Sequence, residues 1–198
     1  MFSKNDRCLN YIYIIILLIL SCKVESNTDI KIKILDHLNS LQYFSASFIQ
    51  NDGENLSEGK VYIGKKRVRA EYLYPSKILI ILDENKAMYY NYELEEDEFF
   101  NPKQTNAWFF YDIFRNPYFF EDSKVVIKNN EIIVEKRGFD KKEIKYLIKA
   151  YFENNPMILR KIDVIIDNDQ LQISIFDHNH NEYFDKNFFK LINPKLLN

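Results

Sequence analysis

The chain has 198 residues, a formal net charge of −2 and a hydrophobic fraction of 46%. This is enough apolar material for one domain with a real core, and too much for a disordered protein. There is no basic excess to neutralise phosphates, so nucleic acid is not an expected partner. The four glycines, at 53, 59, 64 and 138, form no phosphate-binding spacing, which argues against a nucleotide site.

The first 26 residues have the pattern of a secretory signal peptide. Lys4 and Arg7 precede an apolar run over residues 11–20, which is about half the length needed to span a bilayer. Cleavage after Ser26 would leave a mature domain over residues 27–198. We therefore expect an exported protein that resides in the periplasm.

Cysteine usage leaves a second processing route open. Cys8 lies inside the signal, and Cys22 follows Ile19-Leu20-Ser21. Acylation at Cys22 would anchor the protein in a membrane, but Leu20 is an indifferent match to the small residue of a lipobox, which favours cleavage. The mature chain has at most one cysteine, so it has no internal disulfide.

The hydrophobic pattern predicts one helix followed by a mainly β domain. Residues 29–43 repeat apolar side chains every three to four positions, as an amphipathic helix does. The period then becomes two, with turn-prone segments between short runs. We predict eleven antiparallel strands near residues 45–50, 59–63, 67–73, 78–83, 87–92, 124–128, 131–136, 146–152, 158–167, 170–176 and 188–191.

A short aromatic helix interrupts the strands over residues 105–115. It contains Trp108, Phe110 and Phe114 and ends before Asn116-Pro117. Its aromatic side chains cover more than one side, so the helix is either ordinary core or a lid that closes a ligand cavity. The expected fold is an incomplete antiparallel β-barrel in which this helix and the N-terminal one cover an apolar cavity.

The residues offer little for catalysis. There is no Gly-x-Ser-x-Gly elbow, and the only bases of the histidine type are His37, His178 and His180. His178 and His180 have a spacing that a metal could use in an extended segment, although a polar turn is the simpler interpretation. We expect His37 to be solvated, and the acidic run Glu93–Glu98 to be a solvated hairpin edge. The sequence therefore predicts a protein that is not an enzyme and has no metal or cofactor.

Several motifs resemble those of the LolA-type outer-membrane lipoprotein carriers. The segment Tyr43–Gln50 resembles the family's F-x-A-x-F-x-Q motif after the first helix. Further similarities follow at residues 58–59, 69–75, 80–83 and 88–91, and more loosely from 158 to 194. The chain departs from the family at two positions where tryptophan is usual, which are Ala70 and Met88.

The resemblance implies a periplasmic carrier. Such carriers accept acylated lipoproteins from an inner-membrane ABC transporter and deliver them to an outer-membrane acceptor lipoprotein, and we expect a monomer. Alternatives are an outer-membrane-anchored acceptor acylated at Cys22, a periplasmic domain that senses lipids or lipoproteins, and a secreted enzyme using the His178 region.

The resemblance also implies an acyl cavity and an arginine that latches the lid. The latch candidates are Arg67 and Arg69, beside the short turn at residues 64–66. We expect the lid to close over one face of the sheet. The predicted cavity residues are Val68, Ala70, Tyr72, Ile80, Leu82, Met88, Tyr90, Trp108, Phe110, Ile113 and Phe114.

Overall fold

The computed structural model describes residues 27–140 and 142–196. The chain divides into two units, residues 1–30 and 31–198, and the sheet and the lid helix belong to the second. The predicted signal peptide over residues 1–26, with Cys22, lies outside the described residues. Within the described ranges, no helix is both long enough and apolar enough to cross a membrane.

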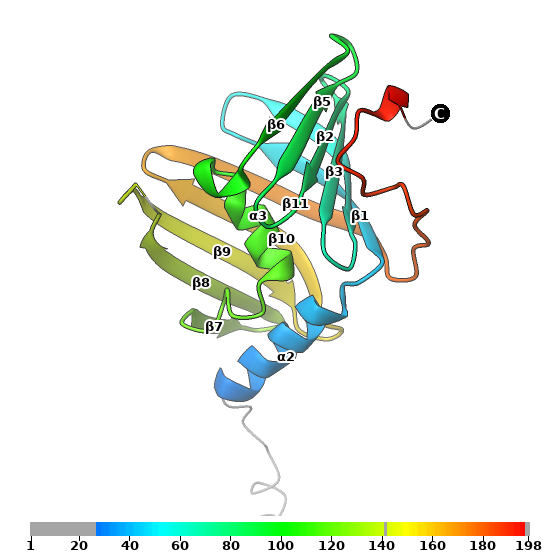
Figure 1. Cartoon of the computed structure of the whole chain (residues 1–198). Coiled ribbons are helices and arrows are strands. Elements are labelled where there is room, and N and C mark those ends of the chain that lie inside the picture. The colour runs from blue at the N-terminus through cyan, green and yellow to red at the C-terminus, as the bar shows by residue number, and fades with distance from the viewer. Residues whose placement is uncertain (1–26, 141, 197–198) are drawn as a thin grey trace, which may run out of the picture. The chain divides into compact units, whose positions relative to one another are not determined.

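The second unit is built on one antiparallel sheet of eleven strands that does not close into a barrel (Figure 1). The spatial order is β6-β5-β4-β3-β2-β1-β11-β10-β9-β8-β7. The predicted fold class is confirmed. The strands are β1 (Phe44–Asn51), β2 (Leu56–Ile63), β3 (Val68–Tyr74), β4 (Ile78–Leu82), β5 (Ala87–Asn91), β6 (Glu96–Phe100), β7 (Lys124–Lys128), β8 (Glu131–Phe139), β9 (Lys145–Glu153), β10 (Ile158–Ile166) and β11 (Asp169–Asn179).

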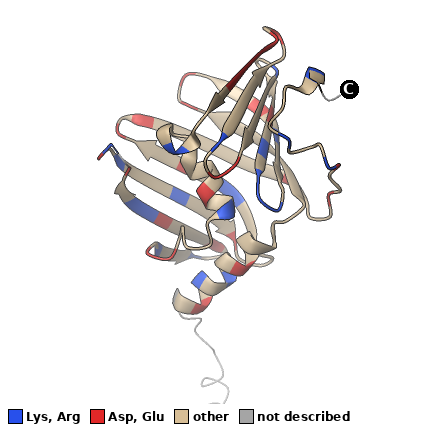
Figure 2. Cartoon of the chain, viewed as in Figure 1, with Lys and Arg blue, Asp and Glu red and all other residues tan. Residues whose placement is uncertain are grey.

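Eleven strands were predicted and eleven are present, but one predicted strand is absent and an unpredicted one takes its place in the count. Only the first half of the acidic run over residues 93–98 is a turn. Its second half belongs to the edge strand β6 (Glu96–Phe100), which pairs with β5. Figure 2 shows the acidic residues gathered on this hairpin. Conversely, residues 188–191 lie in turns and bends and not in a strand, because this aromatic segment packs across the sheet and does not join its hydrogen-bond ladder.

The connection between the two edge strands forms the lid. It starts with η1 (Pro102–Gln104) and continues with α3 (Trp108–Arg115) before the chain enters β7. Since β6 and β7 are the opposite edges of the sheet, the segment that joins them has to cross a face of it. Figure 1 shows α3 lying across the sheet between these edges.

The other helix, α2 (Asn27–Ser40), precedes β1. Within the second unit its apolar side chains Ile34 and Leu38 are buried, as is Leu41 just after it. Lys31 donates a hydrogen bond to the carbonyl of Glu121, which lies after α3. The predicted helix is therefore present, with its apolar stripe inward.

Different segments of the chain pack against the two faces of strands β2–β5. On one face lies α3. On the other face, Leu79, Ile81, Met88 and Tyr90 form a buried cluster against which Leu191 packs. Leu191 belongs to the segment after β11, which ends in η2 (Pro194–Leu196). This C-terminal segment, residues 180–196, explains why β4 is apolar on both faces.

Gly59 has a specific steric role in β2. It lies opposite Phe48 in the ladder, and a Cβ there would overlap the carbonyl oxygen of Glu71 and lie 2.6 Å from the Phe48 ring. Only glycine, which has no side chain, leaves enough room for the Phe48 ring at this position. The Phe48 ring in turn packs edge-on against Tyr72, with 5.1 Å between centroids.

Candidate functional site

A chamber of about 100 Å³ lies between α3 and the sheet. Its walls come from β1, β2, β3, β4, β10, β11 and the lid, so it draws on both halves of the sheet. Twelve of its fourteen lining side chains are hydrocarbon or phenyl groups, the exceptions being Gln50 and Tyr72. The lining is Phe48, Gln50, Val61, Val68, Ala70, Tyr72, Ile80, Leu82, Ala107, Phe110, Phe114, Ile162, Ile173 and Ile175.

Strand alternation brings five predicted residues into the chamber. Val68, Ala70 and Tyr72 share one face of β3, and Ile80 and Leu82 share the same face of β4. The register pairs Val68 with Leu82 and Ala70 with Ile80, so the two sets form one continuous wall. That they contact an acyl chain stays a prediction.

Only one side of the lid lines the chamber. Ala107, Phe110 and Phe114 recur at helical spacing and line the chamber. Trp108 and Ile113, which we predicted to line it too, lie elsewhere. Trp108 packs edge-on against Tyr146, with 5.2 Å between ring centroids, and Ile113 is buried without lining the chamber.

The inward orientation predicted for Met88 and Tyr90 is wrong. The register pairs Met88 with Ile81 and Tyr90 with Leu79, and these four side chains form the cluster on the opposite face. The resemblance placed Met88 at a position where the family carries tryptophan. A doubly apolar strand does not reveal which of its faces is the cavity face, and here the odd-numbered residues of β4 face away.

The latch predicted at Arg67 and Arg69 is also wrong. Arg69 of β3 and Arg67 directly before this strand point to the face opposite the chamber, where their partners lie. Arg67 donates to Asp83 and to the carbonyl of Phe189, at 2.6 and 2.8 Å. Arg69 pairs with Glu71, donates to the carbonyl of Phe188 and stacks on the Phe188 ring at 4.2 Å. They hold the C-terminal segment, not the lid.

A third arginine, which belongs to the lid itself, ties the lid to its surroundings. Arg115 ends α3, and its Nη1 donates to the carbonyls of Gly64 and Lys65 at 2.9 and 3.4 Å. Its Nη2 donates to the carbonyl of Leu41 at 3.3 Å. One guanidinium thus ties the lid to the β2–β3 turn and to the segment after α2. Burial lowers the pKa of Arg115, but a guanidinium remains charged at any physiological pH.

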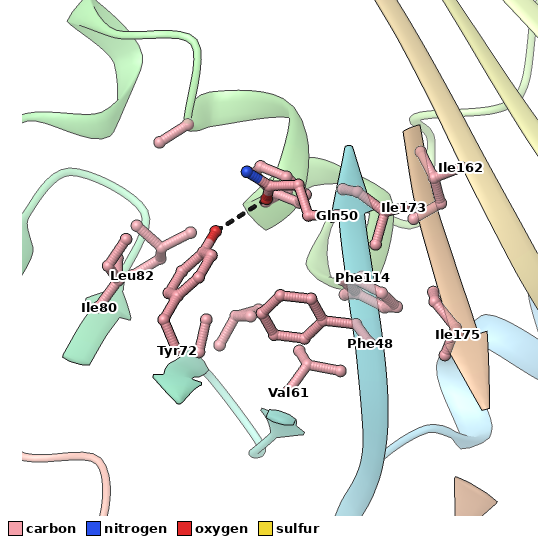
Figure 3. A pocket seen from close by; sticks show the side chains of 14 residues that line it. Phe48, Gln50, Val61, Tyr72, Ile80, Leu82, Phe114, Ile162, Ile173 and Ile175 are labelled. Atoms are coloured by element: carbon pink, nitrogen blue, oxygen red, sulfur yellow. Dashed lines mark hydrogen bonds between the residues drawn. The ribbon is translucent and has the colours of Figure 1, made fainter. Parts of the chain in front are cut away.

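The chamber is uncharged. The Tyr72 hydroxyl donates a 2.9 Å hydrogen bond to Oε1 of Gln50 (Figure 3), so the two polar side chains of the lining are paired with each other. Burial raises the pKa of Tyr72 to about 12, so the phenol stays neutral. A site built in this way can receive a hydrocarbon but has no group poised for acid, base or nucleophilic chemistry.

Sequence reasoning missed half of the chamber. Figure 3 shows Phe48 and Gln50 on β1, with Ile173 and Ile175 of β11 beyond them. Period-two alternation through Phe48 and Gln50, and through Ile173 and Ile175, was a usable signal. It needed the additional fact that β1 pairs with β11, which joins the first strand to the last and is not visible locally.

The histidines do not form a metal site. Among the described residues, no group of three or more His, Cys, Asp or Glu side chains has a metal-binding arrangement. His178 lies at the end of β11, and its Nε2 is 2.9 Å from the carbonyl of Leu159. His37 is half-buried, so its predicted solvation is wrong.

Comparison with solved structures finds similar chains at low sequence identity. An uncharacterized conserved protein from Thermus thermophilus has 11% identity and a TM-score of 0.53, with 82% of this chain and 94% of that one covered. MucB in the Pseudomonas aeruginosa MucA/MucB complex has 9% identity and a TM-score of 0.49, with 83% and 61% covered. Comparison with curated protein sequences finds no match.

The family assignment comes from the sequence of the folded domain. The model of the family described as "Outer membrane lipoprotein carrier protein LolA" matches residues 39–192. This range runs from the end of α2 through all eleven strands, the lid and most of the C-terminal segment. The chain belongs to the LolA family of outer membrane lipoprotein carrier proteins.

Proposed function

We propose that this protein is a periplasmic carrier that binds the acyl chains of lipoproteins released from the inner membrane and delivers them to an outer-membrane acceptor. The observation that carries the proposal is the uncharged, almost wholly apolar chamber under a helix that a single arginine fastens. Membership of the LolA family supports it. The lining supports binding without covalent chemistry, and the protein is proposed not to be an enzyme.

The physics of the cargo explains why a covered chamber is needed. Each methylene removed from water contributes about 0.8 kcal/mol, so a chain of roughly sixteen carbons costs on the order of 12 kcal/mol to expose. Free diffusion of an acylated protein through the periplasm is therefore negligible. A carrier has to cover the hydrocarbon during transit.

With α3 in its present position, the chamber is too small for this cargo. Pockets that enclose drug-sized ligands usually measure about 300–1,000 Å³, whereas this chamber measures about 100 Å³. Loading therefore requires α3 to move away from the sheet. The contacts that such a movement breaks include the Arg115 hydrogen bonds to Leu41, Gly64 and Lys65 and the packing of Phe110 and Phe114.

Depletion of the protein tests the proposed function. We expect lipoproteins to accumulate in the inner membrane of depleted cells, and purified protein to release them from inner-membrane vesicles as soluble complexes. Binding without transfer to outer membranes would instead support a sensing domain. Mass spectrometry of the mature N-terminus separates the remaining alternative, because an acylated Cys22 would identify an anchored acceptor.

Photo-crosslinking tests the assignment of the chamber. A photoreactive residue at Tyr72 or Phe110 is expected to crosslink to a co-expressed lipoprotein, because both side chains line the chamber. Leu73 provides a matched control, since it neighbours Tyr72 on the same strand, faces the other way and is 54% exposed. Equal crosslinking from positions 72 and 73 would contradict the assignment.

A further inference from the structure

The three histidines of the chain, His37, His178 and His180, lie close together and are called the histidine cluster below. His37 lies in the last turn of α2, His178 at the end of β11 and His180 in the segment after it. The rings of His37 and His180 are 6.4 Å apart between centroids. Phe44, the first residue of β1, contacts both others, at 5.6 Å from His178 and 5.1 Å from His180.

The surroundings of His37 and His178 favour neutral rings, whereas His180 is exposed. The His37 ring packs edge-on against Phe152 of β9 at 6.1 Å. The carbonyl of Leu159 can only accept, so the Nε2 of His178 donates to it. Aromatic rings and a single carbonyl provide little solvation for an imidazolium.

Few charged groups oppose protonation or assist it. Arg160 of β10 disfavours a charge on His178, and Asp177 of β11 favours one. Glu182, in the segment after β11, accepts hydrogen bonds from Ser45 and Asn179. From α2, β1 and β9 the contacts to the cluster are His37, Phe44 and Phe152. The charged neighbours that disfavour protonation are His180 and His178 for His37, and Arg160 followed by His180 for His178.

We propose that His37, His178 and His180 form an acid-sensitive joint, which holds the last turn of α2 against the sheet at neutral pH and releases it when the rings are protonated. Three imidazolium groups within one small cluster repel one another. The His37 ring is half-buried, so it becomes fully hydrated by leaving Phe152, and this movement displaces the end of α2.

The direction of the pH dependence follows from the folded-state affinity for protons. Burial, with the neighbouring His180 and His178, lowers the pKa of His37 from 6.5 to about 4, and burial also lowers that of His178. The docked joint binds protons more weakly than the released one. Its stability is therefore complete above about pH 6.5 and is lost as the pH falls towards 4.

The joint is connected to the lid through one residue. Leu41 follows α2 directly, and its carbonyl accepts from Nη2 of Arg115. Releasing the end of α2 therefore removes one of the attachments of α3. Acid would loosen the lid from the α2 side, whereas the Arg115 bonds to the β2–β3 turn would remain.

Hydrogen exchange of the full chain at pH 7.5 and pH 5.0 tests the joint. After correction for intrinsic exchange rates, the opening equilibrium of residues 31–40 is expected to rise about tenfold at pH 5.0, since solvent screening reduces the roughly thirtyfold change that the full pKa difference implies. The variant His37→Gln carries a side chain that does not titrate in this range, and its change should be below twofold. Residues 78–82 of β4 serve as the internal reference.

Two further measurements keep the test decisive. Nuclear magnetic resonance titration of the wild-type imidazoles should show His37 titrating well below 6.5. If His37→Gln proves poorly folded, His180→Gln removes the neighbouring charge and should reduce the pH response of residues 31–40. A normal titration of His37, or an equal pH response in wild type and variants, would overturn the proposal. None of these readouts depends on lipoprotein transport.

Discussion

Replacing Arg115 by methionine is expected to release the lid and expose the chamber. Methionine keeps an unbranched apolar stem like that of arginine but cannot donate, so the carbonyls of Leu41, Gly64 and Lys65 lose their bonds to the lid. Hydrogen bonds to a charged group contribute about 1.5–3 kcal/mol each when well formed. Because two of these three are long, we expect the closed lid to lose about 2–3 kcal/mol.

The change can be followed locally and with an apolar probe. Backbone exchange of residues 108–115 should accelerate by more than tenfold, and fluorescence of an apolar dye such as bis-ANS should increase. Arg160→Met is the matched control, because Arg160 is an exposed arginine on β10 that pairs only with Glu153 among the bonds found for it. If Arg115→Met leaves lid exchange and dye binding at the level of Arg160→Met, Arg115 is not the latch.

Replacing Ile80 by tryptophan is expected to abolish acyl binding while leaving a folded protein. Ile80 lies in the middle of the chamber wall and faces Ala70 across the β3–β4 pair. An indole ring there would occupy space that the hydrocarbon needs, even after α3 has moved. Overpacking a site of this kind costs about 1–3 kcal/mol, but an adjacent cavity absorbs part of the added volume.

Ligand binding and stability have to be measured together for this variant. Affinity for a fluorescent fatty acid should fall by at least tenfold, and the melting temperature should change by only a few degrees. The control Leu73→Trp adds the same ring to the neighbouring strand β3 on the exposed, opposite face. Unchanged fatty-acid affinity in Ile80→Trp would show that hydrocarbon does not occupy the chamber.

Local patterns in the sequence were sufficient to predict most of the fold. Period-two alternation in residues 67–73 placed Val68, Ala70 and Tyr72 on one face and Arg67, Arg69 and Glu71 on the other, as the structure has them. The stop at Asn116-Pro117 placed the end of the lid helix correctly, since α3 ends at Arg115. Both signals depend on side chains close in sequence, which is why they can be read without a fold.

The wrong predictions concern strands that are covered on both faces, by α3 on one side and by the C-terminal segment on the other. Every residue of β4 is apolar, so alternation carries no information about which face borders the chamber. The deciding contact comes from Leu191, about a hundred residues further along the chain. The same C-terminal segment supplies the carbonyls to which Arg67 and Arg69 donate. The family resemblance alone would assign these two arginines to a latch.

The sequence by itself determined the class of the protein: a mainly antiparallel sheet, an amphipathic first helix, an aromatic lid and the LolA family. Only the tertiary structure decided which side chains form the chamber and which arginine fastens it. The reason is that a chamber, a latch and the histidine joint are each made by segments distant in sequence. The pairing of β1 with β11, the crossing of α3 and the course of the C-terminal segment bring them together, and periodicity within one strand contains none of these.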